Sequence, residues 1–196
     1  MASKNRNQRI GIWIIAIVML VGTIGSFLVI ILANSNQKID QQQAAKTEAD
    51  YTKQIAEYQK QQAANSEAFG GFAARTFDAA STTELIVEVI TDGTGEAVKA
   101  SDSINASYFG WLPDGTIFDS SKKKDAEDSP VTFALSGVIA GWTEGLTGVK
   151  VGSVVRLTIP AAKGYGPTAS GIIPADSPLE FIVQIHKIDN TPPATS

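Results

Sequence analysis

Cysteine is absent from this chain of 196 residues, and histidine occurs once, at position 186. The lack of cysteine excludes disulfides, a thiol nucleophile, cysteine-bound metal and lipid attached to cysteine. A single histidine argues against a histidine-based catalytic triad and against a multi-histidine metal centre. Basic residues are also outnumbered by acidic ones, since the chain has 16 Lys and Arg against 20 Asp and Glu. The resulting net charge of −4 argues against a nucleic-acid-binding surface.

Charge is absent altogether from residues 10–33, IGIWIIAIVMLVGTIGSFLVIILA. A helix of that length crosses a hydrocarbon core of about 30 Å with some tilt. Residues 1–9 contain three basic side chains, and only Lys38 follows the run nearby. The positive-inside rule therefore predicts a single transmembrane helix with residues 1–9 in the cytoplasm and the rest outside. A cleaved signal peptide is the alternative, but the apolar run is long and ends in Ile-Leu-Ala, a poor cleavage site.

The composition changes after the apolar run. Residues 34–68 are rich in Gln, Ala, Lys and Glu, which are good helix formers, and they predict a helical or flexible stalk. The apolar positions do not repeat over three heptads, so a coiled coil is not predicted. Residues 69–82 form a glycine-containing joint whose three phenylalanines favour partial docking on the next domain. Residues 190–196 are expected to be a disordered tail.

Strand and turn patterns dominate residues 83–189. Leu179, Phe181, Val183 and Ile185 alternate along the last strand, for example. Only residues 137–146, GVIAGWTEGL, have helical spacing, with Trp142 among their apolar positions. The sequence therefore predicts an α+β domain in which a five- to six-stranded antiparallel β-sheet wraps around one short α-helix.

Six short motifs occur in a fixed order in this domain: GTIFDSS at 115–121, GVIAGWTEGL at 137–146, RLTIP at 156–160, GYG at 164–166, GIIP at 171–174 and PLEFIVQI at 178–185. Together they resemble the FKBP-type (immunophilin) peptidyl-prolyl cis-trans isomerases. The resemblance covers residues 83–189. It implies the FKBP-like fold with an apolar pocket between sheet and helix, and isomerisation of X-Pro bonds. That reaction makes and breaks no covalent bond, so no metal or cofactor is expected.

The same resemblance implies two sets of site residues. The catalytic set is Asp119, Tyr165 and Tyr108. The substrate-binding set is Phe118, Val131, Val138, Ile139, Trp142, Ile172, Ile173 and Phe181. Trp142 is expected to form the floor, and the Ile139 amide and the Tyr165 hydroxyl are expected to donate to substrate carbonyls. Asp119 is expected to accept a hydrogen bond from Tyr108.

Three departures from the family pattern concern this site. Val131 stands where phenylalanine is common, which thins that wall of the expected pocket. The loop between Gly166 and Gly171 is one residue shorter than usual and lacks the histidine often found there. Lys122–Lys124 replace the arginine that often follows the FDSS motif, so an ion pair to Asp119 does not follow from the resemblance.

The combined expectation is a bacterial isomerase of exported or surface proteins, anchored in the cytoplasmic membrane through residues 10–33, with its domain outside. Its expected partners are proline-containing polypeptides and the bilayer, with macrolide immunosuppressants as candidate ligands and the domain itself monomeric. A tethered, non-catalytic module that binds proline-containing segments is the alternative, and a purely structural tether is a weaker one. His186 is expected to be structural or exposed. Phe109 and Trp111, which alternate with Tyr108, are expected to contact the joint.

Overall fold

The computed structural model describes residues 40–190, which fall into two compact units. The boundary between the units, after Gln54, lies inside helix α2, Asp40–Ala64. This helix occupies much of the predicted stalk. Within the described part of the chain, no helix is long and apolar enough to cross a membrane. The predicted transmembrane helix, residues 10–33, and most of the predicted tail lie outside the described residues.

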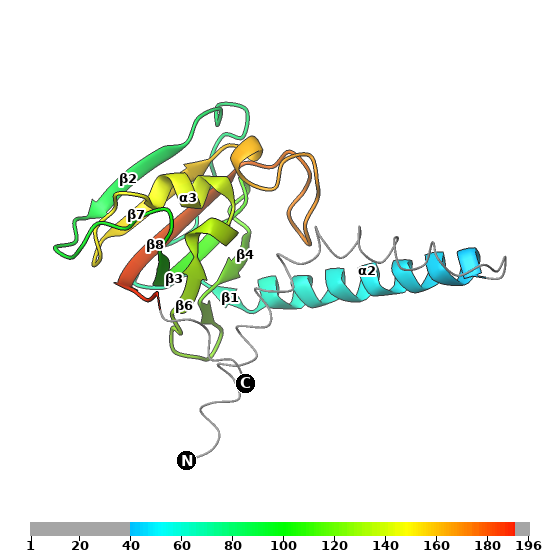
Figure 1. Ribbon diagram of the computed structural model, residues 1–196. Coiled ribbons are helices and arrows are strands. Elements are labelled where there is room, and N and C mark those ends of the chain that lie inside the picture. The colour runs from blue at the N-terminus through cyan, green and yellow to red at the C-terminus, as the bar shows by residue number, and fades with distance from the viewer. Residues whose placement is uncertain (1–39, 191–196) are drawn as a thin grey trace, which may run out of the picture. The chain divides into compact units, whose positions relative to one another are not determined.

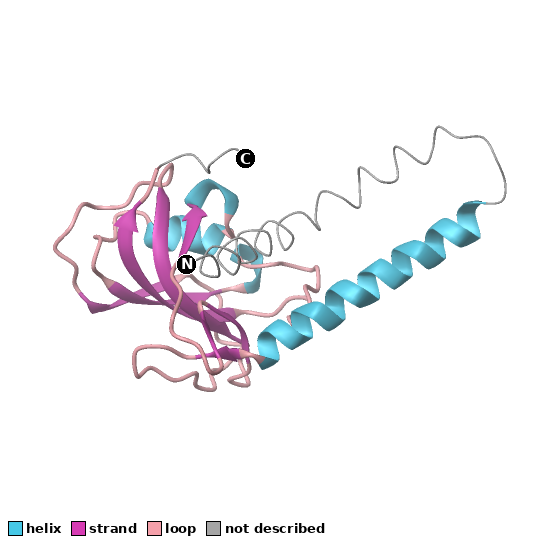
Figure 2. Ribbon diagram, turned by 90° about the horizontal axis from the view of Figure 1, so that it is seen from below, coloured by secondary structure: helices cyan, strands magenta, loops and turns pink. Residues whose placement is uncertain are grey.

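A six-stranded antiparallel sheet forms the centre of the second unit (Figure 1). Its strands are β2 (Ile86–Thr91), β3 (Ser103–Trp111), β4 (Ile117–Ser120), β6 (Val131–Ala134), β7 (Val154–Ile159) and β8 (Leu179–Ile188). The spatial order is β2-β7-β8-β3-β4, and β6 pairs with the first half of β3, on the edge whose second half pairs with β4. A separate small sheet joins β1 (Ser66–Glu67) to β5 (Lys122–Lys123). The predicted fold class is confirmed in its sheet and short helix, and Figure 2 shows the strands from a second direction.

One face of the sheet packs against the short helix α3, Ala140–Leu146, which follows the 3-10 turn η1, Leu135–Gly137 (Figure 1). A second 3-10 turn, η2 (Ala161–Lys163), follows β7. The buried residues of α3 are Gly141, Trp142, Gly145 and Leu146. A Cβ atom added to Gly141 would lie 2.4 Å from Cγ2 of Ile159, on β7. The helix therefore approaches the strand more closely than a side chain at this position would allow.

The other face of the sheet is covered by residues 66–78, which we call the N-terminal arm. Phe69 is buried with Phe109 and Trp111 in one apolar cluster, and its ring meets that of Phe109 edge-on at 5.7 Å. The Trp111 Nε1–H donates to the Arg75 carbonyl over 2.9 Å. The expected contact of Phe109 and Trp111 with the joint is thus confirmed. Because the arm covers this face at β3, β7 and β8, the middle of the sheet is buried on both sides, whereas the edge strand β2 is largely exposed.

Candidate active site

Five aromatic rings from five elements meet between α3 and the sheet, and we call them the aromatic cluster. They are Tyr108 on β3, Phe118 on β4, Phe133 on β6, Trp142 on α3 and Phe181 on β8. Each is at most 9% exposed. The Trp142 ring lies 5.2–5.5 Å from the rings of Tyr108, Phe133 and Phe181, all near-perpendicular to it. Edge-to-face contacts of this kind are favourable beyond simple burial.

A glycine makes room for the rings of β4 and β8. The Cβ of any other residue at position 110 would lie 2.4 Å from Phe181 Cε1 and 2.6 Å from Phe118 Cζ. Those two rings touch edge-on, with centroids 5.5 Å apart. The alternation of β3 therefore places Tyr108 in the cluster and leaves the next position on that face empty for its neighbours.

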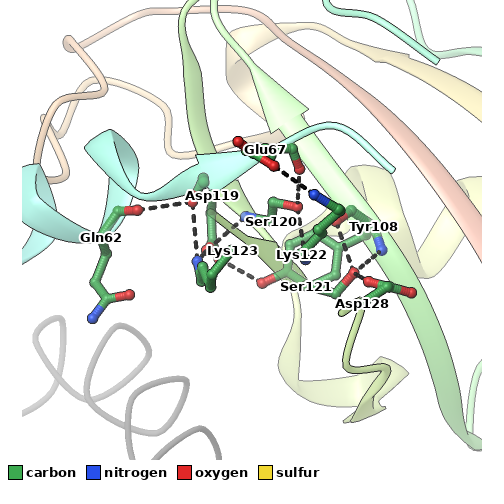
Figure 3. Close-up of polar contacts among 10 residues, drawn as sticks. Gln62, Glu67, Tyr108, Asp119, Ser120, Ser121, Lys122, Lys123 and Asp128 are labelled. Atoms are coloured by element: carbon green, nitrogen blue, oxygen red, sulfur yellow. Dashed lines mark hydrogen bonds and ion pairs between the residues drawn. The ribbon is translucent and has the colours of Figure 1, made fainter. Parts of the chain in front are cut away.

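The carboxylate of Asp119 is held at the edge of the cluster by three donors (Figure 3). The Tyr108 hydroxyl donates to Oδ2 over 2.5 Å, as predicted. The Ser120 backbone N–H and the Lys123 ammonium donate to Oδ1 over 2.8 and 3.1 Å. Lys123 thus forms an ion pair with Asp119, in place of the arginine that often follows this motif in the family. With both oxygens engaged, the carboxylate acts as a fixed charge rather than as a free base.

Both tyrosines of the predicted catalytic set are held protonated. Burial raises the pKa of Tyr108 well above its usual range, and the Asp119 charge adds to the rise. Burial, with a further contribution from Asp119, raises the pKa of Tyr165 to about 12. Tyr165 follows η2 in the loop between β7 and β8 and is half-buried. At neutral pH its hydroxyl is a neutral hydrogen-bond donor.

The other five residues that were predicted to bind substrate are partly or fully buried. Val131 is half-buried on β6, opposite Ala106. Val138 and Ile139 connect η1 to α3, where the Ile139 carbonyl accepts from the Trp142 N–H over 2.9 Å. Ile172 is half-buried and Ile173 is buried in the loop before β8. None of these five belongs to the ring cluster itself.

Sequence reasoning missed Phe133. Its ring lies 5.3 Å from that of Tyr108 and 5.2 Å from that of Trp142, so it is a full member of the cluster. The signal was present, because residues two apart on a strand face the same way and Val131 was already assigned to the site. Phe133 supplies an aromatic ring two residues from Val131, which stands where phenylalanine is common in the family.

The single histidine contacts a serine that in turn contacts an aspartate. In a catalytic triad the histidine stands between the other two residues, so this arrangement is not a triad. Ser107 Oγ contacts both His186 Nε2, at 2.7 Å, and the carboxylate of Asp128. A carboxylate can only accept, so the one Ser107 proton is donated to Asp128 and His186 donates to the serine oxygen. His186 is exposed and Ser107 is fully buried. The histidine therefore cannot act as a base on this serine. No cluster of three or more metal-ligating side chains occurs among residues 40–190.

Comparisons with known proteins show which family the domain resembles. The family model described as FKBP-type peptidyl-prolyl cis-trans isomerase matches residues 94–186. The "FK506-binding protein" of Neisseria meningitidis serogroup A is 42% identical over 106 residues, which cover 53% of this chain and 95% of that protein. "FKBP-type peptidyl-prolyl cis-trans isomerase FkpA" of Escherichia coli K12 is 40% identical over 114 residues.

The match to FkpA covers 58% of this chain and 41% of FkpA, so the similarity is to part of that protein. The crystal structure of E. coli FkpA aligns with a TM-score of 0.49 at 32% identity, over 88% of this chain and 73% of that chain. The matched residues, 94–186, include all five rings of the aromatic cluster, Asp119 and Tyr165. The N-terminal arm and α2 lie outside them.

Proposed function

The chain belongs to the FKBP-type peptidyl-prolyl cis-trans isomerase family, and on that premise we propose that it catalyses rotation about X-Pro bonds at the aromatic cluster. The observation that carries the proposal is the buried set of edge-to-face rings around Trp142 with the Tyr108–Asp119 hydrogen bond at its margin. A proline ring placed against these rings would be largely desolvated. No covalent step is required of the protein.

The physical basis is the resonance of the amide. Rotation about the peptide bond has a barrier of about 18–20 kcal/mol, and an unaided X-Pro bond isomerises in tens to hundreds of seconds. The twisted transition state has less C–N double-bond character and is less polar than the planar amide. An apolar aromatic surface therefore favours the twisted form over the ground state, which is the condition for catalysis. A thousandfold acceleration requires about 4 kcal/mol of such preference.

Two donors orient the substrate in this proposal. The Tyr165 hydroxyl remains protonated through neutral pH and donates to one substrate carbonyl. The Ile139 amide, at the start of α3, donates to another. Asp119 fixes the Tyr108 hydroxyl and places a negative charge beside the rotating bond. Val131, with Ile172 and Ile173, contacts the residues that flank proline and so influences which of them is preferred.

Location is a separate part of the proposal and rests on sequence alone. The uncharged run at 10–33 supports a single-pass anchor, and the basic residues before it support a cytoplasmic N-terminus. The isomerase domain then lies outside the cytoplasmic membrane, where its substrates are exported polypeptides. Protease added to intact cells should digest the domain. Protection of the domain in intact cells, with digestion only after lysis, would contradict this orientation.

Refolding of a protein limited by proline isomerisation tests the activity. The full chain, solubilised in a mild detergent, should accelerate the slow refolding phase in proportion to its concentration. Asp119→Ala and Tyr165→Phe should each lower kcat/KM, by roughly tenfold for a charge-assisted hydrogen bond and severalfold for a neutral one. A wild type no faster than buffer, but still able to bind a proline-containing peptide, would favour the non-catalytic binding module.

A further inference from the structure

The chain that leaves α2 is joined to the loop beside Asp119. Ser66 and Glu67, which form β1, pair in antiparallel register with Lys123 and Lys122. The Lys124 N–H donates to the Asn65 carbonyl over 2.8 Å, and the Ser120 hydroxyl donates to the Glu67 carbonyl over 2.6 Å. Figure 3 shows Lys123 beside Asp119, and Glu67 beside Lys122. A segment outside the matched family region thus forms part of the site's surroundings.

Lys123 connects this segment to the candidate catalytic carboxylate. Its ammonium donates to Asp119 Oδ1 over 3.1 Å and to Ser66 Oγ over 3.0 Å. The Ser66 hydroxyl donates its own proton to the Gln62 carbonyl, in the last turn of α2, over 2.8 Å. The directions are unambiguous, because an ammonium only donates and a carbonyl only accepts. Ser66 is therefore ordered from both sides, and it is only 8% exposed.

The ion pair with Asp119 is too weak by itself to fix the position of the Lys123 side chain. The two side chains are 34% and 42% exposed, and pairs in such surroundings contribute little once side-chain entropy and water are counted. Lysine also lacks the planar guanidinium of the arginine that is common here in the family, which can hold a carboxylate through two parallel hydrogen bonds. The buried Ser66 oxygen supplies a second fixed acceptor, which restricts the ammonium to the position from which it reaches Asp119.

We propose that Ser66 is a positioning residue of the candidate active site and that it acts through Lys123 on Asp119. With the ammonium fixed on Oδ1, together with the Ser120 N–H, the carboxylate keeps Oδ2 directed at the Tyr108 hydroxyl. Without Ser66 the ammonium moves into water and the carboxylate gains rotational freedom. The isomerase domain then depends on the segment that connects it to α2. This inference rests on the proposed isomerase function.

A double-mutant cycle in the full chain distinguishes positioning from a merely structural role. Ser66→Ala should lower kcat/KM about threefold, the effect of one lost hydrogen bond, and Lys123→Met should lower it at least as much. If Ser66 acts through the lysine, Ser66→Ala should have no further effect in the Lys123→Met background. Ser66→Thr keeps the hydroxyl and should restore the wild-type value. Glu67→Gln is the matched control, because it weakens the neighbouring pair with Lys122 and leaves Lys123 in place.

Each outcome has one meaning. Loss in Ser66→Ala, rescue by Ser66→Thr, no additional loss in the double variant and near-wild-type activity in Glu67→Gln would support the proposal. An unchanged Ser66→Ala, or an equal loss in both backgrounds, would overturn the positioning role while leaving the isomerase function intact. A wild type without catalysis would overturn the proposed function itself, and the role of Ser66 with it.

Discussion

The substitution Gly141→Ala has two opposing effects on stability, a gain in helix propensity and a loss in core packing. Gly141 is the second residue of α3, and its replacement by alanine should gain at most about 1 kcal/mol of helix propensity. The new methyl group would lie 2.4, 2.8 and 3.0 Å from Cγ2, Cδ1 and Cγ1 of Ile159. Ile159 is fully buried on β7, so its side chain has no free space into which to move.

The packing cost should exceed the propensity gain. Forcing an extra methyl group into a well-packed core costs about 1–3 kcal/mol. Subtracting the gain leaves a destabilisation of roughly 1 kcal/mol, or a decrease of roughly 4 °C in the melting temperature for a domain of this size. Because α3 also carries Trp142, a displaced helix should lower kcat/KM in addition to stability.

Chemical denaturation of the full chain measures the effect, and Gly145→Ala is the matched control on the same helix. There the closest atom is Leu157 Cδ2, at 2.9 Å, and the next lies at 3.4 Å, so the overlap is smaller than at position 141. Gly145→Ala should therefore be the milder change. Ile159→Ala should cost about 1–3 kcal/mol less in the Gly141→Ala background than in the wild type, because there it also removes the overlap with the new methyl group. A Gly141→Ala variant that is more stable than wild type and fully active would refute the close approach of α3 to β7.

Three further predictions concern the arm, the tyrosine and the glycine of β3. Phe69→Ala should destabilise the domain by about 3–5 kcal/mol in urea unfolding, because Phe69 is buried against Phe109. A pKa of about 12 for Tyr165, against about 10 unfolded, stabilises the fold below pH 10, and this contribution disappears as pH rises towards 12. Tyr165→Phe should accordingly show a shallower loss of stability over that pH interval, and an identical loss would contradict the raised pKa. Gly110→Ala should lower kcat/KM roughly tenfold by displacing the Phe181 ring, and unaltered kinetics would show that the cluster tolerates a side chain there.

The sequence was informative where function is concentrated in short motifs and where strands alternate. Trp142 and Asp119 both lie in contiguous motifs, and the predicted Tyr108–Asp119 hydrogen bond is present. The alternation of β3 separated Tyr108 from Phe109, which placed the latter against the arm. These features depend on local spacing, which a sequence displays directly.

Contacts between distant short segments could not be predicted. Ser66 and Lys123 are 57 positions apart and belong to strands of two residues each, too short to show a period. The arm also lies outside the family motifs, so its integration into the domain was expected only as partial docking. The ion pair of Lys123 with Asp119 depends on that same packing and on a residue type that the family pattern does not specify.

The central claim is that rotation about X-Pro bonds is accelerated at the aromatic cluster. Exchange NMR on a short proline peptide measures cis-trans interconversion directly, at equilibrium and without a folding reaction. Catalytic amounts of the full chain should increase the exchange rate in proportion to enzyme concentration, and Trp142→Leu should reduce that increase strongly while the domain stays folded. An exchange rate that is unchanged by the wild type, or one that Trp142→Leu increases equally well, would contradict the claim.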